Sequence, residues 1–308
     1  MEFKTSTEFA KIWGISERRV RQLIESGRIT GAQKIGKSWL VPGDTKKPRD
    51  TRVSVKDTEF TIELPSILQD VDKKLELLNS KRPLSPNTLK SLKENELVDW
   101  TYHSNGIEGN TLTIKETKVV LEGITIGGKS VKEHLEAINH KEAILYLEDL
   151  VSTKTQLTEQ DIKNIHQLVL REIDNDNAGR YRTENVIIAG AAHIPPNHLI
   201  ARDQMEQLVP RLNSWTKKYH PLVVAALLHG EFVKIHPFAD GNGRTSRLLM
   251  NFVTMRNGYP PLVITKEQRF EYYDALDTAH TTGNYTKFVK MLVELANKAL
   301  DFYLSIIG

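Results

Sequence analysis

The chain has 308 residues and no cysteine. Disulfide bonds, thiolate zinc sites and cysteine nucleophiles are therefore excluded, and this composition fits a reducing compartment, so we expect a cytoplasmic protein. Long apolar runs are also missing, because the longest, residues 221–228, is far short of the roughly 20 residues that a membrane-spanning helix requires. The first residues lack the features of a secretory signal peptide, so the sequence predicts no membrane partner.

A large net charge is missing as well, but the near balance of +3 hides a local excess. Residues 1–56 hold 13 Lys/Arg against 6 Asp/Glu, a balance of +7, so residues 57–308 carry −4. Such asymmetry suggests an anionic partner for the first segment, with nucleic acid as the leading candidate. The 39% of apolar residues is enough to fill a real core.

Residues 1–50 have the pattern of two short helices followed by a hairpin. Residues 5–13 and 17–27 are amphipathic and are separated by a glycine turn, which predicts a helix-turn-helix. Residues 28–44 alternate apolar and basic side chains around two glycines, as a small β-hairpin wing would.

Within the second helix, Val20, Leu23 and Ile24 are expected to face the core. The polar side chains expected to remain available for phosphate or base contacts are Arg18, Arg19, Arg21 and Gln22. The segment resembles the excisionase/MerR-like winged-helix family, which implies DNA binding by residues 1–50. The alternative is a basic helical hairpin that serves packing or solubility.

The rest of the chain is predicted to be mainly α, after a polar, proline-containing linker at residues 51–58. Apolar residues recur at helical spacing in nine segments: 65–78, 88–104, 131–151, 158–172, 203–219, 223–235, 244–257, 267–280 and 285–304. One interruption, residues 184–196, has a β-branched run and a proline-terminated second arm, which predicts a short β-hairpin.

The most informative stretch is KIHPFADGNGRTSR, residues 234–247, which lies between two strongly apolar predicted helices. Its glycine-rich part opens directly into a helix N-terminus. The free N–H groups there, with Gly241 and Gly243 permitting a close approach of the backbone, form a cradle for an anion such as phosphate.

The charged residues of this stretch and its histidine also indicate a phosphate-containing ligand. Arg244 and Arg247 lie at i and i+3 in the first turn of the helix, where cations oppose the helix dipole by roughly 0.3 to 1 kcal/mol each, so an anionic ligand would compensate them. Asp240 suits Mg²⁺, which commonly joins one or two carboxylates to phosphate oxygens. His236 can accept a proton from a hydroxyl at pH 7. The set predicts phosphoryl or nucleotidyl transfer.

The form H-P-F-x-D-G-N-G-R-x-x-R resembles the Fic motif at every defining position, and the likeness extends over roughly residues 60–300. Fic proteins transfer AMP from ATP to a hydroxyl of a target protein, so the resemblance implies an adenylyltransferase that uses ATP and Mg²⁺. It also implies a role for each matching residue: His236 is the catalytic base, Asp240 binds Mg²⁺, Asn242 with the Gly241 and Gly243 amides holds the phosphates, Arg244 contacts the polyphosphate, and Phe238 anchors the ATP-binding loop. The related Doc kinases have lysine where this chain has Gly243. The glycine therefore favours nucleotidyl transfer over phosphate transfer.

A second stretch, SNGIEGN at residues 104–110, resembles the Fic inhibitory motif. Ser104 and Glu108 lie at i and i+4, on one face of a helix, and Glu108 is expected to form a bidentate pair with Arg247, the arginine expected to hold the γ-phosphate. The isolated enzyme should then be slow. The alternative is an ordinary helix C-terminus at Gly109.

Two further features resemble those of the family. Residues 184–196, preceded by GRYR at 179–182, correspond to the Fic flap, whose edge would align a target protein by strand addition. Tyr272 and Tyr273 correspond to the nucleotide-base pocket, while His280 stands where relatives often have asparagine.

The predicted organisation is therefore a Fic-type helical domain with a short β-hairpin flap, preceded by a small winged-helix domain. It comprises a winged helix at 1–50, a linker at 51–58, a helical region with the inhibitory motif at 59–110 and a Fic catalytic domain at 111–308. The predicted function is a self-inhibited protein adenylyltransferase, which could form a homodimer as such relatives often do. The alternatives are a DNA-binding regulator with a nucleotide-sensing Fic module, and a net de-AMPylase.

Overall fold

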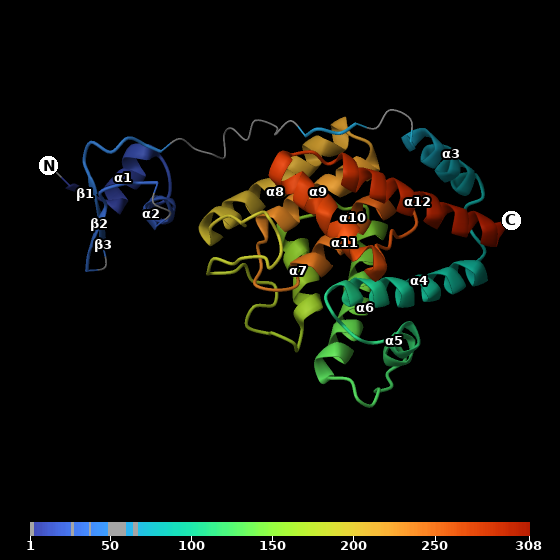
Figure 1. Cartoon of the computed structure of the whole chain (residues 1–308). Coiled ribbons are helices and arrows are strands. Elements are labelled where there is room, and N and C mark those ends of the chain that lie inside the picture. Colours follow the sequence, from blue (N-terminus) through green and yellow to red (C-terminus); the bar gives the residue numbers. More distant parts are fainter. Residues whose placement is uncertain (1–2, 26–27, 37, 49–59, 64–66) are drawn as a thin grey trace. The chain divides into compact units, whose positions relative to one another are not determined.

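The computed structural model of the chain describes residues 3–25, 28–36, 38–48, 60–63 and 67–308 (Figure 1). The chain divides into two compact units, Met1–Thr58 and Glu59–Gly308. The predicted linker at residues 51–58 lies outside the described residues.

The first unit combines two helices with a small antiparallel sheet. Its elements are β1 (Phe3–Thr5), α1 (Ser6–Trp13), α2 (Glu17–Glu25), β2 (Gln33–Ile35) and β3 (Ser38–Pro42). A reciprocal capping box between Thr5 and Glu8 starts α1, and Gly14, in the left-handed conformation, ends it. The strand order is β1-β3-β2. Strands β2 and β3 lie in the segment predicted as a hairpin, whereas β1 was not predicted.

The core of the first unit contains the three residues predicted for it, Val20, Leu23 and Ile24, all of which are buried. Arg19 is buried as well, at 8% exposure, so the prediction that it is available to nucleic acid is wrong. The reason is geometric, because Arg19 lies four residues before Leu23 and shares its face of α2. Arg18 and Arg21 are exposed, as predicted, and the side chain of Gln22 lies outside the described part.

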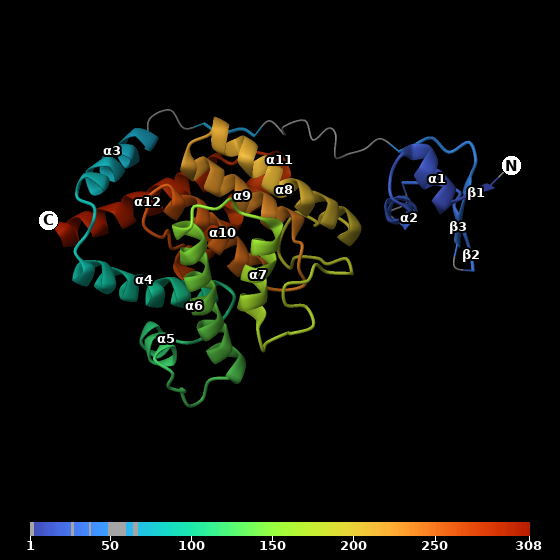
Figure 2. The ribbon, with the colours of Figure 1, turned by 180° about the vertical axis from the view of Figure 1, so that it is seen from behind.

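The second unit is helical. Its elements are α3 (Ile67–Ser80), α4 (Pro86–Ile107), α5 (Ile114–Leu121), α6 (Val131–Ser152), α7 (Glu159–Leu170), α8 (His198–Lys218), α9 (Pro221–Ile235), α10 (Asn242–Arg256), the 3-10 helix η1 (Lys266–Gln268), α11 (Arg269–Thr282) and α12 (Thr286–Ile307). Figures 1 and 2 show α9 and α10 near the middle of this unit.

Helices α9 and α10 form the centre of the core. Every residue from 222 to 232 in α9, and every residue from 244 to 254 in α10, is buried. Helices α8, α11 and α12 pack against α9, while α6 and α7 pack against α10. The loop that joins the two central helices is therefore supported from several sides, which fixes its position.

In the second unit the structure confirms the nine predicted helical segments, and its secondary structure differs from the prediction at two places. Helix α5 was not predicted, although the capping box formed by Thr113 and Glu116 marks its start. Residues 184–196, the predicted β-hairpin, are all described and contain no paired strand. Side chains outside the segment bond to its backbone, among them Arg182 and Asp277.

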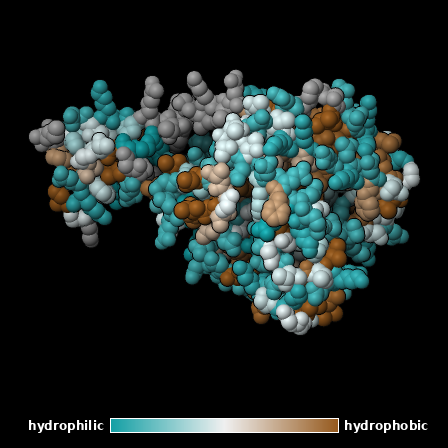
Figure 3. All heavy atoms as spheres, in the orientation of Figure 1, coloured by the Kyte–Doolittle hydropathy of each residue, from teal (hydrophilic) through white to brown (hydrophobic). Residues whose placement is uncertain are grey.

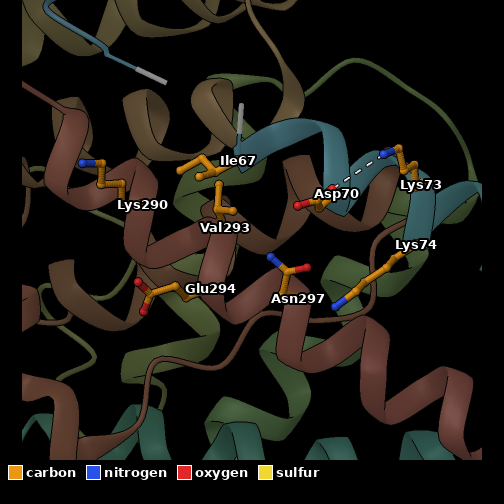
Figure 4. Close-up of a pocket in the computed structure, with 8 residues that line it drawn as sticks. All are labelled: Ile67, Asp70, Lys73, Lys74, Lys290, Val293, Glu294 and Asn297. Carbon is orange, nitrogen blue, oxygen red and sulfur yellow. Dashed lines mark ion pairs between the residues drawn. The ribbon is translucent and has the colours of Figure 1, made fainter. Parts of the chain in front are cut away.

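A groove of about 650 Å³ lies between α3 and α12. Figure 4 shows its lining, in which charged side chains predominate: Ile67, Asp70, Lys73, Lys74, Lys290, Val293, Glu294 and Asn297. Lys73 and Asp70 form an ion pair within it. The groove includes no residue of the predicted catalytic loop.

The close packing of α9 against the start of α12 generates a prediction for stability. A Cβ atom on Gly230 would lie 2.7 Å from the hydroxyl oxygen of Tyr285, whose buried ring is held by a hydrogen bond to Glu231. We expect Gly230→Ala to lower the free energy of unfolding of this unit by about 1 to 3 kcal/mol, because the ring has no room to move. Thermal denaturation measures the change. The control Gly127→Ala, at a position with nothing within 4 Å, should leave the melting temperature unchanged, and equal melting of the two variants would contradict the packing argument.

Candidate active site

The loop between α9 and α10 is shaped by its first and last residues. His236 ends α9 in the left-handed conformation, with a φ of 49°, which is uncommon for a residue other than glycine. Gly241, with a φ of 74°, leads into α10. Between them Phe238 is fully buried, and its ring stacks on the ring of His166 with 3.6 Å between centroids. Phe238 thus anchors the loop in the core, at the position predicted for it.

The side chain of Asn242 closes this loop. Its Oδ1 accepts from the N–H of Phe238 at 3.0 Å, and its Nδ2 donates to the carbonyl of Phe238 at 2.9 Å. Because both polar atoms are engaged and the residue is buried, the side chain is not presented to a phosphate as the resemblance implied. What Asn242 and Gly243 offer an anion is the backbone N–H at the start of α10, a helix without a side-chain cap among the described residues.

His166 of α7 is a supporting residue that the sequence did not reveal. Its Nδ1 accepts from the N–H of Gly179 at 2.9 Å, and its Nε2 donates to the carbonyl of Asp240 at 2.8 Å. Burial lowers the pKa of His166 to about 4, so the ring is neutral and each nitrogen has one defined role. A single histidine within a helix gives no sequence signal for such a contact.

His236 lies at the end of α9 with most of its ring buried. Burial, followed by the neighbouring Arg182 cation, lowers its pKa to about 4, against the opposing effects of the Val233 carbonyl, Glu108 and Asp240. The imidazole is therefore neutral at pH 7 and can accept a proton. Its Nδ1 is buried and makes no hydrogen bond with any residue that the structure describes.

Arg247 is 2% exposed and is held by the end of α4. Its Nη2 lies 2.7 Å from Oε1 of Glu108 and donates to the carbonyl of Ser104 at 2.8 Å, while its Nε donates to the Ser104 hydroxyl at 3.1 Å. The predicted contact is therefore present, although it uses one carboxylate oxygen and is not bidentate. Burial is the largest single effect on the pKa of Arg247 and lowers it, but Glu108 and Tyr272 together outweigh burial, so the pKa is raised.

Glu108 occupies the space beside Gly243. A Cβ atom on Gly243 would overlap Oε1 of Glu108 and would lie 3.1 Å from Nη1 of Arg247. A side chain at this position would displace the carboxylate from the place where it now lies. Glu108 itself is the first residue beyond α4, so the helix ends where the ion pair begins.

Arg244 is a second buried guanidinium with unused donors. Its Nη1 lies 3.3 Å from Oε1 of Glu136 and its Nη2 lies 3.5 Å from Oδ2 of Asp240. Neither Nε nor Nη1 makes a hydrogen bond with a described residue, despite 2% exposure of the side chain. Buried donors of this kind are normally satisfied, so the position fits an anionic ligand. Glu136, on α6, was not identified from the sequence.

Asp240 can contribute one carboxylate to a metal ion. Its side chain is 57% exposed, and its Oδ1 accepts from the N–H of Gly241 at 2.6 Å. Among the described residues, no group of three or more His, Asp or Glu side chains could hold a metal by itself. This donor set fits Mg²⁺ that is shared with the phosphates of a nucleotide, because Mg²⁺ accepts one or two carboxylates plus phosphate oxygens.

The two tyrosines predicted for the nucleotide-base pocket differ in position. Tyr273 is 38% exposed and lies against Arg269, so its ring is available to a ligand. Tyr272 is 1% exposed, and its hydroxyl is 2.8 Å from Nε2 of His229. The predicted base contact by Tyr272 is therefore wrong for this conformation, because the residue points into the core beneath Arg247.

The flap, residues 184–196, is an irregular exposed segment. Ile187 and Ile194 are 86% and 74% exposed. Figure 3 shows apolar side chains at the surface around the connection between α7 and α8, to which the flap belongs. His193 of the flap donates from Nε2 to the carbonyl of Lys234, two residues before His236, at 2.9 Å.

Comparison with known proteins gives a consistent result. The sequence pattern of the Fic/DOC family matches residues 156–254. A protein adenylyltransferase Fic from Drosophila melanogaster is 38% identical over 251 residues, which cover 77% of this chain and 50% of that protein. The chain thus spans about half the length of this curated relative.

Two solved structures are similar over most of their length. Fic-1 from C. elegans is 32% identical with a TM-score of 0.71, and the match covers 78% of this chain and 71% of that one. A Fic domain containing signaling protein from Bacteroides thetaiotaomicron is 31% identical with a TM-score of 0.71, over 79% of this chain and 97% of that one. The chain belongs to the Fic/DOC family. No helix in the described ranges has the length and apolar content to cross a membrane.

Proposed function

We propose that this protein is a protein adenylyltransferase that is inhibited by its own Glu108. The observation that carries the proposal is the pair of buried arginines at one helix N-terminus, Arg244 with unused donors and Arg247 held by Glu108. Two such cations next to the neutral base His236 suit a polyphosphate whose reacting phosphorus faces a hydroxyl.

The reaction follows from this arrangement. His236 takes the proton of a target Ser, Thr or Tyr hydroxyl while the hydroxyl oxygen attacks the α-phosphorus of ATP. A bond forms between that oxygen and phosphorus, the bond from the α-phosphorus to the oxygen bridging to the β-phosphate breaks, and pyrophosphate leaves. The backbone N–H groups of Asn242 and Gly243, with Arg244, hold the phosphates.

Mg²⁺, bound through Asp240 and the phosphates, would neutralise charge that develops on the leaving group. Asp240 is suited to this role because its carboxylate is exposed and already oriented by the N–H of Gly241. Tyr273 supplies the exposed ring for the nucleotide base.

Inhibition follows from competition for Arg247. The γ-phosphate and the Glu108 carboxylate are both anions, and Nη2 of Arg247 can be 2.7 Å from only one of them. While Glu108 stays, the polyphosphate is shifted and its α-phosphorus does not face His236. Ser104 strengthens the closed state through its hydroxyl and carbonyl oxygens.

The exposed segment 184–196 is the proposed dock for the target protein. Its chain is not paired in a sheet, so most of the N–H and carbonyl groups between its two ends, though not the N–H of Ala192, which is bonded to Asp277, remain available for an extended target segment to add alongside. Main-chain recognition of this kind places a hydroxyl near His236 without reading much of the target sequence.

Labelling with ATP tests the proposed activity. We expect weak incorporation of α-labelled ATP into the wild-type protein and a rise of about tenfold to a hundredfold in Glu108→Gly, because a charge-assisted contact of about 1.5 to 3 kcal/mol no longer competes. Adding His236→Ala should reduce that gain by a factor of about 10² or more, since the general base is lost. Product is measured as label retained by the denatured protein.

Two matched measurements separate the alternatives. Incorporation of γ-label without α-label by Glu108→Gly would indicate a kinase and would contradict the proposal. Release of AMP from the labelled product by wild-type protein, faster than Glu108→Gly can attach it, would make the protein a net de-AMPylase in which Glu108 orients the attacking water.

We propose DNA binding as a second function, carried by the first unit as a winged helix. Its support is the exposed Arg18 and Arg21 on α2, the helix that precedes the β2–β3 hairpin in the chain. They lie in a segment of net charge +7, set by 13 Lys/Arg and 6 Asp/Glu in residues 1–56. Arg21 is partly engaged by an ion pair with Glu17. Phosphate contacts by such side chains would release counterions from the duplex.

Duplex binding by the full-length protein tests this function. We expect an affinity that falls steeply with salt, and in Arg18→Ala/Arg21→Ala a weaker affinity with a salt slope smaller by about 1 per lost phosphate contact. The exposed Lys115 on α5 provides the control, because Lys115→Ala should bind as the wild type does. Absence of binding at low salt would leave the first unit with a protein-docking or structural role.

A further inference from the structure

Arg182 connects the flap to the catalytic histidine. Its side chain is 5% exposed, and its guanidinium donates from Nη1 to the carbonyl of Glu184 at 2.7 Å and from Nη2 to the carbonyl of Pro196. These are the first and last residues of the flap. Its Nε donates to the carbonyl of His236 at 2.8 Å, and its backbone N–H donates to the carbonyl of Pro237 at 2.9 Å. One residue therefore ties both ends of the flap to the start of the catalytic loop.

The side chain of Arg182 makes hydrogen bonds of defined geometry and no ion pair among the described residues. The recorded acceptors of its side chain are main-chain carbonyls, and no carboxylate lies within ion-pair distance in the part of the chain that the structure describes. A buried cation without a counter-ion is costly, and burial lowers the pKa of Arg182. The planar fork of arginine can hold three carbonyl groups in one fixed relation, which the single ammonium of lysine cannot do.

The flap depends on such external contacts. Among its described backbone groups, the internal hydrogen bond is that from the N–H of Ala191 to the carbonyl of Ile188, at 3.3 Å. Two attachments hold its middle: His193 donates to the carbonyl of Lys234, and the N–H of Ala192 donates to the carboxylate of Asp277 at 3.3 Å. Without a ladder of its own, the flap takes its position from such contacts, and Arg182 is the residue that holds both of its ends.

The carbonyl that Arg182 binds belongs to a residue in a rarely adopted conformation. His236 has a φ of 49°, and such a conformation persists in a non-glycine residue only where the surroundings hold it. We propose that Arg182 is the positioning residue that sets the target-docking flap in register with the base His236. The proposal rests on the proposed function, in which a hydroxyl on the flap must come within hydrogen-bond reach of His236.

The test compares Arg182→Lys, Arg182→Gln and the exposed control Arg180→Gln in the full-length Glu108→Gly protein. At saturating MgATP we expect self-labelling with α-labelled ATP to fall about tenfold or more in both Arg182 variants, because a displacement near 1 Å is enough to cost up to a factor of about 10². The dissociation constant of MgATP should stay within twofold, since Arg182 contacts no nucleotide-binding residue other than the loop carbonyls. Arg180→Gln should label as the parent does.

Two further readouts distinguish positioning from general structural support. The labelling rate falls at low pH as His236 becomes protonated, and the midpoint of this fall should move to higher pH in Arg182→Gln but not in Arg182→Lys. The reason is that the Arg182 cation lowers the pKa of His236, while Asp240 and, in the wild type, Glu108 raise it. Amide hydrogen exchange should become faster in residues 184–196 in both variants and stay unchanged in α9. This exchange measurement does not require activity, so it still decides the proposal if the Glu108→Gly parent fails to label and the proposed function is wrong.

The proposal is contradicted by three results. These are unchanged labelling and unchanged flap exchange in both Arg182 variants, a loss of labelling that is matched by an equal loss of MgATP affinity, and melting of both variants below the assay temperature. The last result would make Arg182 a residue of general stability.

Discussion

The charge of Arg247 is the constraint on which the site depends. A guanidinium at 2% exposure, at the positive end of a helix, needs an anion close by, because an unpaired charge in such a position costs several kcal/mol. Glu108 supplies that anion at 2.7 Å, and Gly243 leaves the space for it. The same position that makes Arg247 suitable for a phosphate thus makes it suitable for an internal carboxylate. A closed state follows from the electrostatics of the site.

The loop geometry explains why the chemistry is confined to one short stretch. Left-handed backbone at His236 and at Gly241 turns the chain twice within six residues, and Phe238 with the side chain of Asn242 fills and closes the space between. The supports come from distant elements. His166 of α7 holds the Asp240 carbonyl and Arg182 holds that of His236. The base is therefore rigid, while its partners in the reaction, a target and a nucleotide, are delivered to it.

Much of this could be predicted from the sequence, because the catalytic loop is local. The residues from His236 to Arg247 lie on one loop and the first two turns of one helix, so their types and spacing define their neighbours. The contact between Glu108 and Arg247, 139 residues apart, was predicted only through the family resemblance.

The remaining contacts could not be predicted, for different physical reasons. His166, Glu136 and Arg182 act through tertiary contacts that leave no periodic signal in the sequence. Of two adjacent helical residues, Tyr272 and Tyr273, only one can face a bound nucleotide, because successive side chains are rotated by about 100° around a helix. The flap has the composition of a β-strand but no strand to pair with, so its backbone does not adopt the structure that its β-propensity predicts.

Glu108 and the γ-phosphate of ATP are expected to compete for Arg247. A crystal structure of Glu108→Gly with MgATP tests this competition most directly. We expect the γ-phosphate on Arg247 in the place of the carboxylate, with the α-phosphorus facing His236. A nucleotide whose phosphates leave Arg247 bound only to Ser104, with the α-phosphorus turned away from His236, would contradict it.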